Sequence, residues 1–336
     1  MRILSITFLV LALFLVKREA VAQRYFVTNQ YVYDLFLVNP SAVALKKDCY
    51  TISGYYQKQW YGMDLAPTTQ MLAFQKTFQN NVGIGTYAYN DRNGYHHEIG
   101  FQQSFGYKVV LSKTRKHLST LLFGLSGMLA DRSIDMSSFG TSGALDPAIG
   151  GGSNVSGFSF NANAGIMATY NNWRLGFSAT NLFPFVNPIY TSYAEPKTYI
   201  DLNIHAGTLF KLPKIDLFLE PLIFYRRNNY LDSRLDLNLK FTLPTPNPNI
   251  TLWGLMAYRR SQDAQMGKSL GTAVTAGVFL GQFKVGLEYQ LGLTQARSDF
   301  GNSYLLVFGY RACRDRKKDA LTCPEDFKRN KRRVMH

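Results

Sequence analysis

Apolar and polar residues alternate with a period of two along most of the chain, while a helical period of 3.6 is hard to find after the N-terminal segment. Residues 158–170 show the alternation most clearly. One face carries Phe158, Phe160, Ala162, Ala164, Ile166, Ala168 and Tyr170, and the other carries Ser159, Asn161, Asn163, Gly165 and Thr169, with Met167 as the one exception. Successive side chains of a β-strand point to opposite faces, so this segment predicts a strand with one oily and one polar face.

Ionic side chains occupy the polar face in the middle of such segments. In residues 283–291, Lys284 and Glu288 alternate with branched aliphatic and aromatic residues. Strands of about 10–15 residues are long for a soluble β-sandwich, which is the alternative fold. The pattern favours a transmembrane barrel with a wet lumen and an outer surface in contact with lipid.

Counting these segments predicts an all-β, antiparallel up-and-down barrel of about 14 strands. The expected spans are 48–61, 67–79, 82–91, 95–111, 116–135, 156–170, 173–182, 196–211, 215–228, 232–243, 249–262, 268–281, 282–295 and 300–311. Pro221 lies inside one of them, and a bulge or strand break is expected there because proline cannot donate to the ladder.

The connections between these segments alternate between short and long. Outer-membrane barrels place short turns in the periplasm and long loops outside, so both termini are expected in the periplasm.

The N-terminus carries export features. Arg2, an apolar run over residues 3–16 and the small-x-small sequence at residues 20–22 predict a signal peptide at 1–22, and the apolar run is too short to span a bilayer. The expected organisation is therefore a signal peptide (1–22), a periplasmic segment (23–47), an outer-membrane barrel (48–311) and a basic periplasmic tail (312–336). Location in the outer membrane of a Gram-negative bacterium follows.

Composition supports this assignment. Aromatic residues make up 14% of the chain and charged residues only 18%, a balance typical of amphipathic strands with aromatic belts. The formal net charge is +15, and residues 311–336 hold ten Lys/Arg against four Asp/Glu. Such a tail suits anionic lipid or an acidic protein, whereas export argues against nucleic acid.

The sequence contains no motif that predicts catalysis, a cofactor or a metal. His96 and His97 are adjacent, so on a strand they point to opposite faces, and no Cys or carboxylate pair has ligand spacing. His117 and His205 lie on predicted strands without a G-x-S-x-G nucleophile motif. An enzyme assembled from distant strands stays an alternative.

Three cysteines allow one disulfide. Cys49 opens the first predicted strand and Cys313 follows the last, and a closed barrel makes these strands neighbours. Cys323 lies in the tail. All three map to the periplasmic rim, where a bond can persist, but the connectivity stays open at this point.

Three ordered stretches resemble the PorP/SprF family of type IX secretion system outer-membrane proteins. Residues 29–42 (Asn29-Gln30-Tyr31 through Asn39-Pro40-Ser41-Ala42) are similar to the family's opening motif. Residues 59–70 and 80–94 resemble its next two motifs, although Leu65 stands where the family usually has Gly. The rest of the chain matches in barrel pattern, and the basic tail extends past the aromatic-ended strand where many members stop.

The resemblance implies a non-catalytic component of a secretion and gliding motility machine, serving the export or surface anchoring of a large adhesin. The implied partners are outer-membrane lipid, periplasmic secretion-ring or peptidoglycan-binding proteins, and the adhesin. The topology places a candidate cargo-facing surface on the first two outer loops, formed by Trp60, Gly62, Pro67, Thr68, Gln70, Asn90, Asp91 and Gly94. The alternative role for these residues is to fold the loops. A porin or hydrophobic-solute transporter is the alternative function.

Overall fold

The computed structural model describes residues 29–45, 49–78, 81–114, 117–135, 155–189, 197–212, 216–228, 233–262, 269–292 and 300–313. Its strands are β1 (Cys49–Lys58), β2 (Thr68–Thr77), β3 (Val82–Asn93), β4 (His96–Lys113), β5 (Leu118–Ile134), β6 (Val155–Tyr170), β7 (Trp173–Thr180), β8 (Asp201–Gly207), β9 (Phe210–Leu212), β10 (Leu217–Asn228), β11 (Ser233–Pro244), β12 (Ile250–Ser261), β13 (Ser269–Leu280), β14 (Phe283–Gly292) and β15 (Ser303–Cys313). Each predicted span overlaps one of these strands, and the largest departure is the predicted start at 196, where β8 begins at Asp201.

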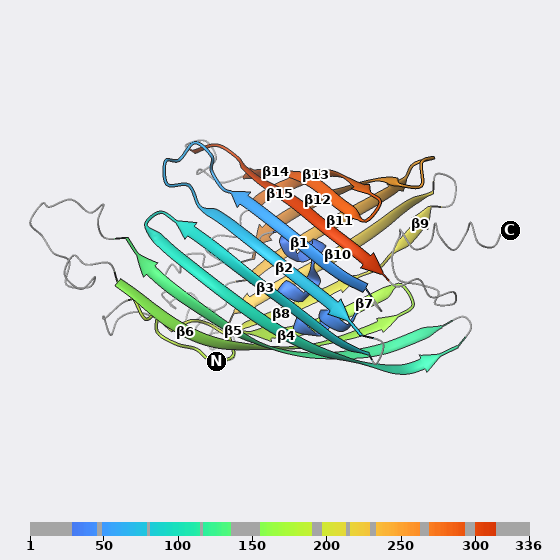
Figure 1. Cartoon of the computed structure of the whole chain (residues 1–336), viewed down its shortest axis with the longest axis horizontal. Helices are drawn as coiled ribbons and strands as arrows, with labels where there is room; N and C mark the ends of the chain where they lie inside the picture. The colour runs from blue at the N-terminus through green and yellow to red at the C-terminus, as the bar shows by residue number, and fades with distance from the viewer. Residues whose placement is uncertain are drawn as a thin grey trace, which may run out of the picture.

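The strands form a closed antiparallel barrel in which each strand pairs with its neighbours in the sequence (Figure 1). β8 and β9 both pair with β10 and act as two pieces of one strand, so the barrel has 14 strands, as predicted. Pairing between β1 and β15 closes the ring. The first pair in that register is Cys49 and Cys313, which form a disulfide.

The break expected at Pro221 occurs in the neighbouring strand. β10 continues through Pro221, which pairs with Leu239 on β11. On its other side, β8 ends at Gly207 and β9 resumes at Phe210. Thr208 still donates its backbone N–H to the Pro221 carbonyl at 3.2 Å. Because Pro221 has no N–H to donate, the strand opposite it is interrupted between β8 and β9. The pairing of β10 with β11 continues through Pro221 without a register shift.

The alternating pattern sorts side chains between the outside and the inside of the barrel. On β6, Phe158 and Phe160 point outward and are exposed, whereas Ser159, Asn161 and Asn163 point inward and are buried. This confirms the predicted faces. Met167, the exception in the pattern, points inward and is fully buried, so the inside of the barrel is partly apolar.

The chain before β1 lies inside the barrel and fills part of it. It consists of α2 (Gln30–Tyr33), η1 (Leu35–Leu37) and η2 (Pro40–Ala44), and Figure 1 shows these helices, in blue, enclosed by the strands. We call residues 29–45 the plug. The sequence predicts a periplasmic segment over residues 23–47 and a wet lumen, but the described part of that segment packs against the inner wall of the barrel. The hydrophobic effect explains this packing, because Phe36, Leu37 and Val43 are buried among inward-facing wall residues.

The plug runs from one end of the barrel to the other. Its first residues contact Gln57 and Arg259, near the strand ends that lead into long connections. At its other end, Leu45 accepts a hydrogen bond from Lys108, near the short β4–β5 turn. No helix in the described part of the chain is long and apolar enough to cross a membrane.

Candidate functional site

The plug is seated on a track of inward-facing glycines. The track crosses five consecutive strands at Gly83, Gly85, Gly106, Gly124, Gly165 and Gly176. A Cβ at Gly83 would lie 2.3 Å from the Val43 carbonyl oxygen, and one at Gly165 would lie 2.1 Å from Asn39 Oδ1. Real Cβ atoms do not approach other atoms this closely, so these wall positions admit only glycine while the plug is in place.

Asn39 ties the plug to the far side of the track. Its Oδ1 caps η2 by accepting from the Ser41 backbone N–H at 3.0 Å and the Ser41 hydroxyl at 2.7 Å. Its Nδ2 lies 3.0 Å from Nε2 of His205, which is fully buried on β8. Pro40 follows at the first helical position, where its missing N–H costs nothing.

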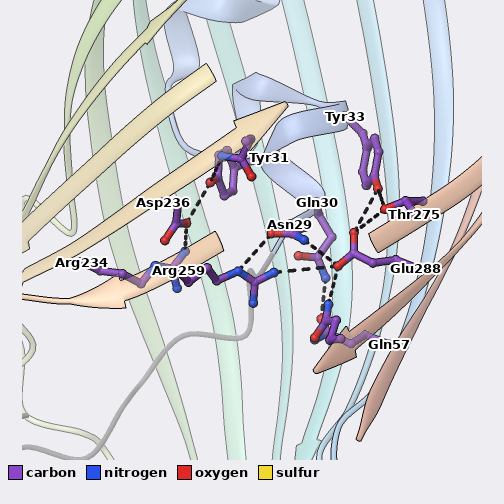
Figure 2. A network of polar contacts seen from close by, with 12 residues as sticks. Asn29, Gln30, Tyr31, Tyr33, Gln57, Arg234, Asp236, Arg259, Thr275 and Glu288 are labelled. Atoms are coloured by element: carbon purple, nitrogen blue, oxygen red, sulfur yellow. Dashed lines mark hydrogen bonds and ion pairs between the residues drawn. The ribbon is translucent and has the colours of Figure 1, made fainter. Parts of the chain in front are cut away.

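Glu288 on β14 is the centre of a polar network at the start of the plug (Figure 2). Asn29 donates to its Oε1 at 2.6 Å, and Tyr33 donates to its Oε2 at 3.0 Å. From the wall, Thr275 also donates to Oε2 at 3.0 Å, and Arg259 lies 3.8 Å away as an ion pair. Glu288 is fully buried, so these contacts replace the water that its carboxylate has lost.

A second anchor lies on β11. Tyr31 donates its hydroxyl to Asp236 at 2.8 Å, and Arg234 pairs with the same carboxylate at 2.7 Å. Asn238 donates to the Tyr31 hydroxyl at 2.9 Å, and the Tyr31 ring packs on Phe224 with centroids 4.5 Å apart. Charge-assisted hydrogen bonds in a buried setting are among the stronger polar contacts, so the helix α2 is held on two sides.

The middle of the plug is held by apolar contacts. Phe36 and Val43 belong to one buried cluster with Tyr87, Leu122 and Met167 of the wall. This explains why Met167 interrupts the polar face of β6. Sequence reasoning missed the plug, although two signals were present: the inward glycines on adjacent strands and the polar motif at residues 29–42 that carried the family resemblance.

The predicted cargo-facing residues lie near the end of the barrel with the long connections, but only half of them are in loops. Trp60, Gly62 and Pro67 lie between β1 and β2, and Gly94 lies in the β3–β4 turn with φ of 64°. The other four are on strands: Thr68 and Gln70 on β2, and Asn90 and Asp91 on β3. The predicted strand spans 67–79 and 82–91 include these four residues and are confirmed there, whereas their assignment to the outer loops is wrong, because ladder pairing continues to Thr68↔Arg92.

Two of the loop members, which follow β1, form hydrogen bonds with residues at or just before the start of β15, the strand that pairs with β1 to close the barrel. The Trp60 backbone N–H donates to the Ser303 hydroxyl at 3.1 Å, and that of Gly62 donates to the Phe300 carbonyl at 3.0 Å. Among the strand members, Thr69 donates to the inward-facing Asp91, and Asn90 donates to Gln70 at 3.5 Å on the outer face. The eight residues therefore do not form one surface.

Within the described residues, no group of three or more His, Cys, Asp or Glu side chains is placed to hold a metal ion. His97 contacts Asn90 at 2.6 Å on the outer face of the barrel. Cys323 lies outside the described residues, so the structure assigns one disulfide, Cys49–Cys313, to the two cysteines that it describes.

Several solved structures match this chain at low sequence identity. The CymD monoaromatic hydrocarbon channel matches with a TM-score of 0.53 and 10% identity over 89% of this chain and 96% of that one. The Ralstonia pickettii toluene transporter TbuX gives a TM-score of 0.48 at 12% identity, covering 83% and 93%. CdiB from Acinetobacter baumannii gives 0.42 at 9% identity, and the match spans 79% of this chain and 60% of CdiB. No curated protein matches the sequence.

A family model assigns the chain more closely than these structures do. The model for the type IX secretion system membrane protein PorP/SprF matches residues 20–310, which include the plug and nearly all of the barrel. A closed 14-strand barrel that matches this membrane-protein family is located in the outer membrane. The chain belongs to the PorP/SprF family of type IX secretion system membrane proteins.

Proposed function

We propose that this protein is a non-catalytic outer-membrane component of the type IX secretion and gliding motility machinery, which supports export or surface anchoring of a large adhesin and docks to periplasmic components. The observation that carries the proposal is the plug. A general porin needs a water-filled lumen, whereas this barrel buries its own N-terminal segment there between two charged anchors. A filled lumen argues against a general diffusion porin, and the match to the PorP/SprF family favours a secretion component over a plugged transporter.

The proposal orients the barrel with its short turns in the periplasm and its long connections outside. In that orientation, the Cys49–Cys313 disulfide lies at the periplasmic rim, at the point where the basic tail leaves the barrel. The tail carries ten Lys/Arg counted from Arg311 and suits an acidic docking surface on a periplasmic partner.

Truncation after Cys313 tests the docking role and keeps the disulfide intact. The truncated barrel should still show heat-modifiable mobility on a gel, because a closed ladder resists detergent until boiled. Pull-downs from solubilised envelopes should recover less of the periplasmic secretion components. Equal recovery from truncated and full-length strains would remove the docking role.

Asp91→Ala tests the cargo-facing role at the other end. Asp91 lies on β3 near the long connections, and Asp216→Asn also removes one negative charge, beside the short β9–β10 turn, with a residue that tolerates the φ of 50° at that position. Asp91→Ala should reduce surface display of the adhesin in cells whose barrels assemble normally, while Asp216→Asn should not. Normal display in both strains would leave Asp91 with a role in folding the barrel rim only.

A further inference from the structure

The outer faces of β1, β2 and β3 carry three graded rows of side chains near the end with the long connections. The outermost row is Lys58, Thr68 and Arg92, which are register partners across the three strands. The next row is Tyr56, Gln70 and Asn90. The third is Gly54, Leu72 and Ala88. Residues two apart on a strand are about 7 Å apart and share a face, so the surface changes from basic to amide to apolar along the strands.

The lower two rows form a groove in the outer wall of the barrel. Gly54, Tyr56, Gln70, Leu72, Ala88 and Phe308 are among its lining residues. The groove exists because the third row has two small members: a Cβ at Gly54 would meet only Phe308 Cβ, at 3.9 Å. Its lower part is apolar, and Phe308 and Leu72 on its sides are half or more exposed.

The basic row above the groove carries two cations with no ion-pair partner in the part of the chain that the structure describes. Lys58 and Arg92 flank Thr68 on adjacent strands, so their backbones are about 10 Å apart, and both long side chains can reach a single headgroup. Arginine binds phosphate through two parallel N–H donors, and lysine adds a point charge. Tyr56 packs on Tyr304 beside the row, as tyrosines do at membrane interfaces.

We propose that this surface binds a phosphorylated lipid of the outer leaflet, of the lipid A class, with its phosphate between Lys58 and Arg92 and one acyl chain in the groove over Gly54 and Ala88. The amide row, Gln70 and Asn90, meets the sugar and ester groups between phosphate and chain. This assigns a lipid-binding role to Gln70 and Asn90. The site uses the proposed orientation of the barrel but not its role in secretion, so failure of either idea leaves the other standing.

Native mass spectrometry of the full-length protein in mild detergent, with added bisphosphorylated lipid A, phosphatidylglycerol or phosphatidylethanolamine, tests the site. The wild type should retain lipid A in preference to both phospholipids. Lys58→Gln and Arg92→Gln should each weaken retention about fivefold, and the double variant about thirtyfold, as expected for loss of one basic residue at an anionic lipid surface. Gly54→Leu should also reduce retention by filling the groove, since the position has room for a side chain.

Arg227→Gln is the matched control, because Arg227 is exposed on the outer face of β10, near the same end of the barrel, but away from the groove. It should leave retention unchanged. The proposal would be overturned by equal loss in Arg227→Gln, by wild-type retention in both the Lys58→Gln/Arg92→Gln and Gly54→Leu variants, or by preference for phosphatidylglycerol over lipid A. Displacement of lipid by a second copy of the chain, seen as a dimer that loses the groove-dependent lipid, would also contradict it. Heat-modifiable mobility confirms that each variant has assembled.

Discussion

Gly124 on β5 lies directly under Ser41 of the plug, so close that a Cβ on Gly124 would be 2.2 Å from the Ser41 backbone nitrogen. The wall and the plug are therefore complementary in shape. Position 124 requires glycine because the plug is so close, and η2 can approach the wall because Gly124 has no side chain. A side chain at this position has to move either the strand or the plug, and the strand is fixed by ladders on both sides.

Gly124→Val should displace the plug and leave the barrel closed. Hydrogen exchange followed by mass spectrometry should show faster exchange in residues 29–45 than in the wild type, since amides that leave a buried site lose protection. Gly127→Val is the matched control three residues along the same strand, where a Cβ would meet only Phe160, at 3.7 Å. Equal hydrogen exchange of residues 29–45 in the two variants would show that the close contact at Gly124 does not hold the plug in place.

Glu288→Ala should destabilise the protein more than any other single truncation of the polar anchors. It leaves Arg259 without its carboxylate and Asn29, Tyr33 and Thr275 without an acceptor. Removing one partner of a buried ion pair costs about 3–5 kcal/mol. The midpoint temperature of heat-modifiable mobility should fall clearly for Glu288→Ala and less for Glu288→Gln, which keeps an acceptor oxygen. Identical midpoints for wild type and Glu288→Ala would contradict the network.

The disulfide should stabilise the seam between β1 and β15. It joins residues 264 positions apart, and in the chain-entropy model a loop of more than 100 residues corresponds to stabilisation of about 5 kcal/mol. Cys49→Ser or Cys313→Ser should lower the same midpoint, reductant should do so for the wild type, and Cys323→Ser should not change it. A fall with Cys323→Ser alone would point to a different pairing.

Lipid contact should make outward positions sensitive to charge according to depth. Leu125 lies in the middle of β5 and is 66% exposed, whereas Leu111 is 63% exposed near the short β4–β5 turn. Arginine costs about 2–4 kcal/mol at the membrane midplane and about 0–1 kcal/mol near the interface. Leu125→Arg should therefore reduce the assembled fraction, measured as heat-modifiable protein, while Leu111→Arg should be tolerated. Equal yields would mean that these faces do not meet lipid.

The strands were predictable because alternation is a local property. Ser159 and Phe160 differ in polarity at adjacent positions, and this alone sets which of them faces inward. Closure of the barrel placed Cys49 beside Cys313 on neighbouring strands, although it did not choose between Cys49 and Cys323 as the disulfide partner of Cys313. Pro221 correctly predicted an interruption of the sheet but not its position. The missing N–H breaks the neighbouring strand between β8 and β9, whereas β10 is continuous.

The plug was not predictable from local pattern, because its contacts join residues far apart in the sequence. Asn29 reaches Glu288 across 259 positions, and Tyr31 reaches Asp236 across 205. Residues 29–44 contain short helical turns without an amphipathic period, which in isolation resemble a linker. For the predicted cargo-facing surface, Gln70 and Asn90 fall inside the predicted strand spans 67–79 and 82–91, so the strand prediction was right for them and their assignment to the outer loops was not.

The most direct test of a plugged, non-conducting scaffold is conductance in a planar bilayer. The wild type should show no stable channel openings, because residues 29–45 occupy the lumen between the anchors at Glu288 and Asp236. A variant lacking residues 29–45, shown to be assembled by heat-modifiable mobility, should show open-channel steps. Stable openings in the wild type, of the same size as those of the deletion variant, would contradict the account and favour the porin alternative.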